Sequence, residues 1–269
     1  MSDFLEQVIR ERRADVAAAR AAVSDDRILA QAQVGPQRPF DHFYQTMRNR
    51  RSSLAVIAEV KRISPALGVL VESFDPVAQA MRYVAAGATA ISVLIEGRHW
   101  GGSLGDLVAI REAVGVPLLA KDVIVDAYQI YEARAAGADA VLLIAEALED
   151  SELRHLVSIA KRLGMSALVE AHEASAFGRA VSSGAQVVGV NARNLRHPAD
   201  IDVGRVRQLH TFVRADQILV AESGITSIDD ARMLPARVDA VLVGTALMRA
   251  EDPGQLIQEI ASIHRTVHA

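Results

Sequence analysis

The chain has 269 residues, 51% of them hydrophobic, which allows one large domain with a sizeable core or two smaller domains. Its net charge of −4 provides no bulk attraction for nucleic acid or for an anionic membrane. The absence of cysteine excludes a disulfide framework and a thiolate nucleophile. The N-terminus lacks the apolar stretch of a signal peptide, and no run approaches the ~18 apolar residues of a membrane span. We therefore expect a cytoplasmic protein with no nucleic-acid or membrane partner.

The first 54 residues lie outside the repeating pattern that follows. The stretch from Ser2 to Ala22 predicts an amphipathic helix, because apolar residues such as Phe4 and Val8 recur at helical spacing. Residues 33–40 contain proline and are typical of a loop, and residues 42–49 predict a second short helix. A helical extension of this kind can cover either end of the domain that the rest of the chain forms.

From residue 55 onward, short apolar runs alternate with segments of helical periodicity. Eight runs are near-continuous hydrophobics, as expected for parallel strands covered on both faces: Ala55–Val60, Ala90–Ile95, Val116–Ala120, Ala138–Ala145, Ser166–Val169, Gln186–Val190, Gln217–Ala221 and Val238–Val243. Helices are predicted over Asp75–Ala85, Ser103–Val114, Ala127–Ala136, Ser151–Leu163 and Asp229–Leu234. Eight such units favour an α/β fold with one closed (β/α)8 TIM barrel over residues 1–269, in which residues 1–54 form an N-terminal helical extension. An open doubly wound sheet is the alternative.

Polar and ionisable residues end several of the predicted strands, where barrels of this type carry their active sites. These residues are Glu59, Lys61, Lys121, Glu170, Asn191 and Glu222. Glu59 and Lys61 are two residues apart and so share one face of a strand. Charges at the end of an apolar strand are costly to desolvate unless they are paired, and a Lys–Glu network can move pKa values towards neutrality for proton transfer. We interpret the set as catalytic; a salt-bridge network that only closes the barrel top is the alternative.

Two glycine-containing turns follow the last two predicted strands. They are Glu222-Ser223-Gly224-Ile225-Thr226 and Gly244-Thr245-Ala246-Leu247-Met248. Glycine lets backbone amides approach a ligand closely, and a helix N-terminus attracts anions. We predict a phosphate site at these turns, to which Ser64 adds a hydroxyl group; two ordinary tight turns are the alternative. No histidine has metal-ligand spacing, and no dinucleotide fingerprint occurs, so we expect neither a metal nor a cofactor.

Several segments resemble the motifs of the indole-3-glycerol-phosphate synthase family, in that family's order. The resemblance covers about residues 55–250 and is highly specific. It is carried by Ile57-Ala58-Glu59-Val60-Lys61-Arg62-Ile63-Ser64-Pro65, Leu119-Ala120-Lys121-Asp122, Leu168-Val169-Glu170, Gly189-Val190-Asn191-Ala192-Arg193-Asn194-Leu195 and Ala221-Glu222-Ser223-Gly224-Ile225.

The resemblance implies a cofactor-free carboxy-lyase of tryptophan biosynthesis. Its phosphorylated substrate, 1-(2-carboxyphenylamino)-1-deoxyribulose 5-phosphate, is closed to indole-3-glycerol phosphate with release of carbon dioxide and water. The resemblance makes Lys121 the general acid of ring closure and Glu170 the base or acid of the dehydration. Glu59 and Lys61 would assist proton transfer and charge stabilisation, while Asn191 and Glu222 orient hydroxyl groups and the lysines. The implied substrate-binding residues are Ser64, Gly224, Gly244 and Thr245 for the phosphate, Ser223 beside them, and Arg193 and Leu195 at the anthranilate ring.

The chain departs from the family pattern at several positions, among them Ala66-Leu67 and Ala192. Val123 and Trp100 stand where the family usually has Phe, and Ile95 where it has Thr. The first two fall where the aromatic part of the substrate would bind, so a paralogue acting on a substituted anthranilate is one alternative. A phosphoribosylanthranilate-isomerase-like enzyme is disfavoured by the absence of Cys and the presence of Lys121 with Glu170. A non-catalytic barrel would be expected to lose some of the strand-end residues. We expect a monomer or a weak homodimer.

Overall fold

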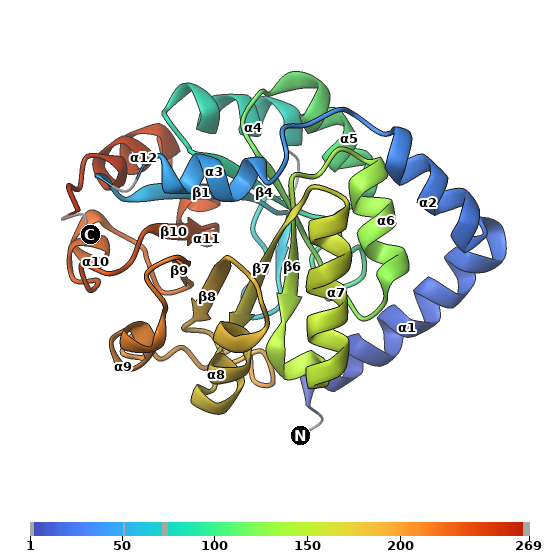
Figure 1. Cartoon of the computed structure of the whole chain (residues 1–269). Coiled ribbons are helices and arrows are strands. Elements are labelled where there is room, and N and C mark those ends of the chain that lie inside the picture. Colours follow the sequence, from blue (N-terminus) through green and yellow to red (C-terminus); the bar gives the residue numbers. More distant parts are fainter. Residues whose placement is uncertain (1–2, 51, 72–74, 266–269) are drawn as a thin grey trace.

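The computed structural model describes residues 3–50, 52–71 and 75–265. Eight parallel strands close into a barrel in the order β1-β10-β9-β8-β7-β6-β5-β4, with helices around the outside (Figure 1). The strands are β1 Ala55–Val60, β4 Ala90–Leu94, β5 Leu118–Lys121, β6 Ala140–Ile144, β7 Ser166–Ala171, β8 Val187–Asn191, β9 Ile218–Glu222 and β10 Ala240–Val243. The predicted (β/α)8 barrel is confirmed, and the open-sheet alternative is wrong because β1 pairs with both β4 and β10.

The five helices predicted between the strands are confirmed to within two residues at each end. They are α4 Pro76–Ala85, α5 Leu104–Ala113, α6 Ala127–Ala135, α7 Asp150–Arg162 and α10 Ile228–Arg232. Four more helices follow the strands of the second half: α8 Ala174–Ser182, α9 Arg205–Leu209, α11 Thr245–Arg249 and α12 Pro253–Ala261, with 3-10 turns η1 Ala145–Ala147 and η2 His210–Phe212. No helix of the described residues is long and apolar enough to cross a membrane.

The N-terminal extension contains three helices, α1 Phe4–Ala22, α2 Asp25–Val34 and α3 His42–Arg48. The first and third were predicted, although Ser2 lies outside the described residues. The second was missed, and residues 33–34, predicted as loop, end it. Its only buried side chains are Ile28 and Ala32, because it packs along α6 at the edge of the molecule (Figure 1).

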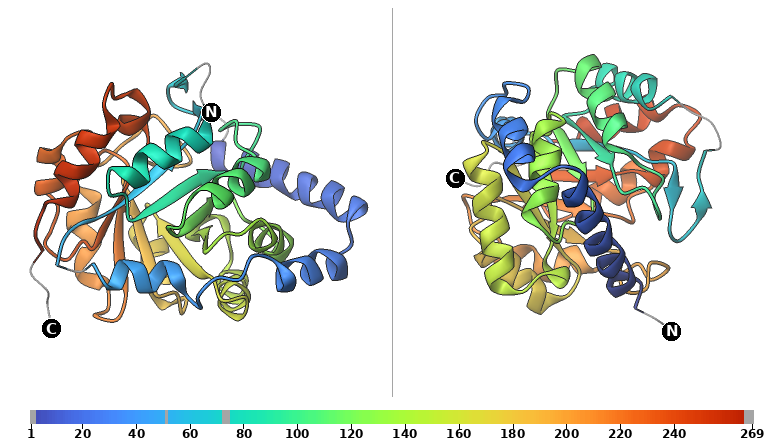
Figure 2. Two further views of the ribbon diagram at one scale, coloured as in Figure 1. Left: turned by 90° about the horizontal axis from the view of Figure 1, so that it is seen from above. Right: turned by 90° about the vertical axis from the view of Figure 1, so that its right-hand side faces the viewer.

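The extension covers both ends of the barrel. The buried side chains of α3, among them Phe43 and Met47, join the apolar cluster formed by the first inward residues of the strands. At the opposite end, Leu5 and Val8 of α1 line the cavity at the carboxyl ends of the strands. A short hairpin, β2 Ile63–Ser64 with β3 Gly68–Val69, projects from the rim between β1 and α4 and was not predicted (Figure 2).

Alternation along the strands determines which side chains enter the barrel. In β1, Val56 and Ala58 belong to the outer core beneath the helices, whereas Ala55 and Ile57 belong to the inner cluster. Because successive side chains of a strand point to opposite faces, the inward set continues to Glu59. The same two-residue step leads from inward apolar side chains to the polar residues at or near the ends of β5, β7 and β9, which are Lys121, Glu170 and Glu222.

Asp139, just before β6, joins the extension to the lower end of the barrel, where the strands begin. Its fully buried carboxylate accepts hydrogen bonds from Arg38 Nε at 2.8 Å, Arg111 Nη1 at 2.9 Å and the Leu118 backbone N–H at 2.9 Å. Removing one member of a buried ion pair leaves its partners' charge uncompensated, which is more costly than losing a surface pair.

We therefore expect Asp139→Asn to lower the free energy of unfolding by about 3 kcal/mol, measured by urea denaturation. The control is Asp229→Asn, which breaks an ion pair with Arg232 whose side chains are 83% and 61% exposed; it should cost less than about 0.5 kcal/mol. Equal losses in the two variants would contradict this account of Asp139.

Candidate active site

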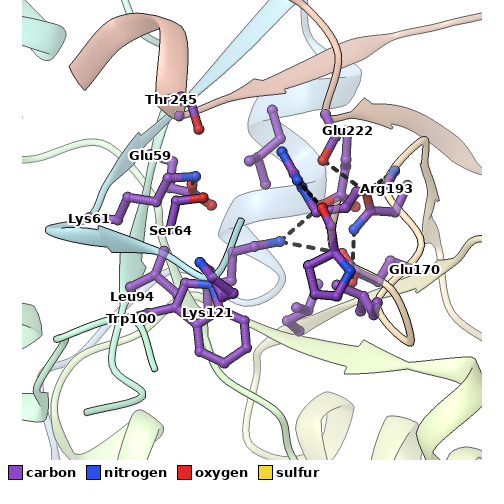
Figure 3. A pocket seen from close by; sticks show the side chains of 18 of the residues that line it. Glu59, Lys61, Ser64, Leu94, Trp100, Lys121, Glu170, Arg193, Glu222 and Thr245 are labelled. Carbon is purple, nitrogen blue, oxygen red and sulfur yellow. Dashed lines mark hydrogen bonds and ion pairs between the residues drawn. The ribbon is translucent and has the colours of Figure 1, made fainter. Parts of the chain in front are cut away.

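A cavity of about 240 Å³ opens at the carboxyl ends of the strands (Figure 3). Every site residue that the sequence predicted lines it: Glu59, Lys61, Ser64, Lys121, Glu170, Asn191, Arg193, Leu195, Glu222, Ser223, Gly224, Gly244 and Thr245. Glu59, Lys61 and Ser64 lie on one side of the cavity, Glu170, Arg193 and Glu222 on the other, and Lys121 between them. The structure thus brings the predicted set together.

Lys121, the last residue of β5, is the centre of the charged network. Its Nζ lies 3.0 Å from Glu222 Oε2 and 3.3 Å from Glu170 Oε2. Asn191 Nδ2 donates to the second oxygen of Glu170 at 3.3 Å. Burial disfavours the ammonium charge, but Glu170, Glu222 and Glu59 outweigh it and raise the pKa of Lys121. Lys121 therefore stays protonated at neutral pH and presents a proton donor to the cavity.

Glu59 and Lys61 form a second ion pair, with 2.5 Å between Glu59 Oε1 and Lys61 Nζ. Burial opposes the charge of Glu59, but the positive charges of Lys61 and Lys121 prevail and lower the pKa of Glu59. Glu59 is therefore ionised at neutral pH. The two lysines each have at least one carboxylate partner, which compensates for the cost of withdrawing their charge from water.

Glu222, at the end of β9, behaves differently from Glu59. Burial and the neighbouring charge of Glu170 raise the pKa of Glu222 well above its ordinary value, although Lys121 opposes this. Its Oε1 atom has no hydrogen-bond partner within the described part of the chain. Gly189 makes room for it: a Cβ atom at that glycine would lie 2.3 Å from Glu222 Oε1. Glu170 and Glu222 thus share a site in which one carboxyl group is readily protonated.

Two of the predicted phosphate-site glycines lie in close contact with neighbouring side chains. A Cβ atom at Gly244 would lie 2.1 Å from Glu59 Oε1 and 2.9 Å from Lys61 Nζ, so a larger residue would displace the ends of that ion pair. Ser223 and Gly224 both have positive φ, 67° and 75°, and a Cβ atom at Gly224 would lie 2.7 Å from Val203. The predicted reasons for these glycines were close approach of a ligand or, as the alternative, tight turns; their contacts with Glu59, Lys61 and Val203 were not predicted.

Asn191 organises the loop that follows β8. Its Oδ1 accepts hydrogen bonds from the Ser223 hydroxyl and the Arg193 backbone N–H, both at 2.9 Å. The Arg193 guanidinium donates to the Pro198 carbonyl, and burial lowers the pKa of Arg193 despite the nearby charge of Glu59. Leu195, on the same loop, packs against the inner apolar cluster.

Three of the departures from the family pattern, Val123, Trp100 and Ile95, occupy different places. Val123 and Trp100 line the cavity, whereas Ile95 packs against the outer core beneath the helices. Substitution at Ile95 therefore affects packing, while Val123 and Trp100 shape the space available to a ligand. Figure 3 shows Trp100 among the side chains that line the cavity.

Sequence reasoning missed several lining residues. From α1 come Phe4, Leu5 and Val8, whose apolar face was recognised without a position in space. Glu96 was also missed, although it follows the inward Leu94 by the two-residue step that identified the other strand-end residues. Among the described residues, no group of three or more His, Asp or Glu side chains is arranged to hold a metal ion.

Comparison with known proteins agrees with the geometry. A family model described as indole-3-glycerol phosphate synthase matches residues 5–260. A protein of that name from Nocardioides sp. is 47% identical and covers 96% of this chain and 98% of its own. Another of that name from Kineococcus radiotolerans is 42% identical, with 98% of each chain covered.

Solved structures support the fold. A thiamine phosphate pyrophosphorylase from Pyrococcus furiosus superposes with a TM-score of 0.58 over 79% of this chain and 95% of its own. Its sequence is 20% identical, so this likeness concerns the barrel alone. The match over nearly the whole chain, together with relatives above 40% identity, establishes that the chain belongs to the indole-3-glycerol phosphate synthase family.

Proposed function

We propose that this chain catalyses the closure of 1-(2-carboxyphenylamino)-1-deoxyribulose 5-phosphate to indole-3-glycerol phosphate, in tryptophan biosynthesis. The observation that carries the proposal is Lys121, held between Glu170 and Glu222 in a cavity that also contains the Glu59–Lys61 pair. The reaction must place a proton on a ketone oxygen, stabilise a cation and then remove a proton and a hydroxyl group. The ammonium and carboxylate groups that surround one cavity meet these demands: the first can donate a proton, and the second can accept a proton or stabilise a cation.

In the first step, the ring carbon that bears the carboxylate attacks the ketone carbon of the ribulose chain. The carbonyl electron pair moves to oxygen, which receives a proton from Lys121. The new ring is cationic and faces Glu59 and Glu170, which stabilise it electrostatically. Loss of carbon dioxide returns the electron pair of the broken bond to the ring and restores its aromaticity.

In the second step, the intermediate loses water. Glu170 removes a proton from the carbon next to nitrogen, and the hydroxyl group leaves after accepting a proton from a neighbouring acid. Glu222 is suited to hold a proton close by, because its pKa is raised by burial and by Glu170. Asn191 orients Glu170 through its amide group.

The substrate is expected to lie across the cavity. Ser64, Gly224, Gly244 and Thr245 bind the phosphate at the rim, where backbone N–H groups and hydroxyls are available. Ser223 completes this side through Asn191, and Lys61 holds the substrate carboxylate. Arg193 and Leu195 border the anthranilate ring. We further propose that the enzyme works in the cytoplasm as a monomer or weak homodimer, without a cofactor, a metal, nucleic acid or a membrane.

Lys121 supplies the first test. The sequence contains three lysines, and Lys161 is the one outside the site. We expect the purified protein to convert the anthranilate–ribulose phosphate conjugate, followed by indole fluorescence, and Lys121→Ala to lower kcat by about 10³-fold through loss of the general acid. Lys161→Ala should stay within about twofold of the wild type.

Substantial turnover by Lys121→Ala would remove Lys121 from the chemistry. Absence of turnover by a folded wild-type protein would favour the second candidate, an enzyme for substituted anthranilates. That candidate is supported by Val123, which lines the cavity where the family usually has the larger Phe.

Glu222 supplies a test by pH. In the unfolded chain its carboxyl group ionises near its ordinary pKa of 4.5, whereas the folded site retains the proton to higher pH. Its contribution to stability is therefore fully present below pH 4.5 and is lost as the pH rises through the raised folded pKa. Glutamine cannot ionise, so the Tm of Glu222→Gln relative to the wild type should increase by about 2 °C or more between pH 4.5 and pH 8. The exposed Glu112→Gln should show no such trend; a pH-independent difference for Glu222→Gln would contradict the raised pKa.

A further inference from the structure

The loop after β4 is organised by one buried carboxylate. Glu96 is 1% exposed, and its Oε1 accepts the backbone N–H of Arg98 at 2.9 Å. Its Oε2 accepts the backbone N–H groups of His99 at 2.7 Å and Trp100 at 3.1 Å. Three successive residues with N–H groups on one carboxylate leave the loop a single backbone path.

Backbone contacts close the same loop at its far end. The Gly102 N–H donates to the Glu96 carbonyl at 2.8 Å, and a Cβ atom at Gly102 would lie 2.1 Å from the Leu94 carbonyl oxygen. The Trp100 carbonyl accepts the Ile63 N–H at 3.3 Å, which joins the loop to the hairpin that carries Ser64. The loop therefore doubles back tightly over the end of β4.

The loop presents two aromatic side chains, which both contact Phe4 of α1. Trp100 lines the cavity and meets Phe4 of α1 edge-on, with 5.9 Å between ring centroids (Figure 3). His99 faces α1, where its Nε2 lies 2.5 Å from Glu11 Oε2 and its ring 5.1 Å from Phe4. One wall of the cavity, made of Trp100 and the first turn of α1, therefore depends on the path of this loop.

We propose that Glu96 is a positioning residue for the proposed reaction: it fixes Trp100 as the aromatic wall of the substrate cavity and, through His99, holds α1 against that wall. The nature of the substrate rests on the proposed function, but the loop contacts do not. In the described part of the chain, the hydrogen bonds of the Glu96 side chain go to the loop backbone, and the proton-transfer network is built on Lys121. Glu96 thus acts on substrate binding through Trp100.

Kinetics provide the first readout. Glutamine has one acceptor oxygen, so Glu96→Gln sets an NH2 group against a backbone donor and releases part of the loop. We expect KM for the conjugate to rise about tenfold, with kcat within about threefold and an unchanged pH profile. If Glu96 acts through Trp100, then Glu96→Gln combined with Trp100→Ala should raise KM no more than the stronger single variant. Additive effects, or a loss confined to kcat, would overturn the proposal.

Fluorescence provides a readout that needs no substrate, because Trp100 is the only tryptophan of the chain. In Glu96→Gln we expect red-shifted emission and stronger acrylamide quenching, with far-UV circular dichroism like that of the wild type. The matched control is Asp239→Asn, whose carboxylate accepts the Leu219 N–H at the opposite end of the barrel. It should lower Tm without moving the emission of Trp100.

An unchanged emission of folded Glu96→Gln would overturn the proposal even if the chain proved inactive on the conjugate. Glu96→Asp serves if the glutamine variant does not fold, since it keeps both acceptor oxygens but withdraws them by one methylene. We expect for it an intermediate red shift and an intermediate KM; wild-type values of both would also overturn the proposal.

Discussion

The structure of the site depends on one requirement: a charge that is withdrawn from water must be paired with a charge of opposite sign. Lys121 ends an apolar strand inside the barrel, where an isolated ammonium group would be strongly disfavoured. Glu170 of β7 and Glu222 of β9 supply the compensation. Because three carboxyl groups surround Lys121, their combined charge keeps it protonated, while burial and Glu170 raise the pKa of Glu222. The ion pairs that stabilise the site are therefore the same groups to which we assign the proposed acid–base chemistry.

The barrel makes that arrangement possible through small residues as much as charged ones. Gly189 and Gly244 stand on strands or turns beside the carboxylates, and a single methyl group at either would overlap Glu222 or Glu59. The interior of a barrel is filled by layers of closely packed side chains. A residue without a side chain therefore leaves volume in its layer for a large charged neighbour. The glycines of this site thus leave space for its charged side chains, in addition to the ligand contacts that we propose for Gly244.

Sequence patterns predicted the features that follow from periodicity. The eight strands, the shared face of Glu59 and Lys61 and the convergence of the strand-end residues all derive from alternation and barrel closure. What they did not predict depends on long-range contacts. The helix α2 has only two buried side chains, Ile28 and Ala32, so the apolar periodicity of its sequence is weak. The wall formed by α1 and Trp100 joins residues nearly a hundred positions apart. Glu96 was visible to the alternation rule, but its function as a backbone acceptor depends on the loop's path.

In barrel enzymes of this kind, the residues needed for activity usually lie at the carboxyl ends of the strands, and those needed for stability lie at the amino ends. The segment before β1 does not respect that division, because its first helix forms part of the cavity and its third seals the lower end. The intervening Arg38 adds a clasp to Asp139. A change in this segment therefore affects both the packing of the barrel and the shape of the cavity. Replacing it with the corresponding segment of another barrel would disturb both at once.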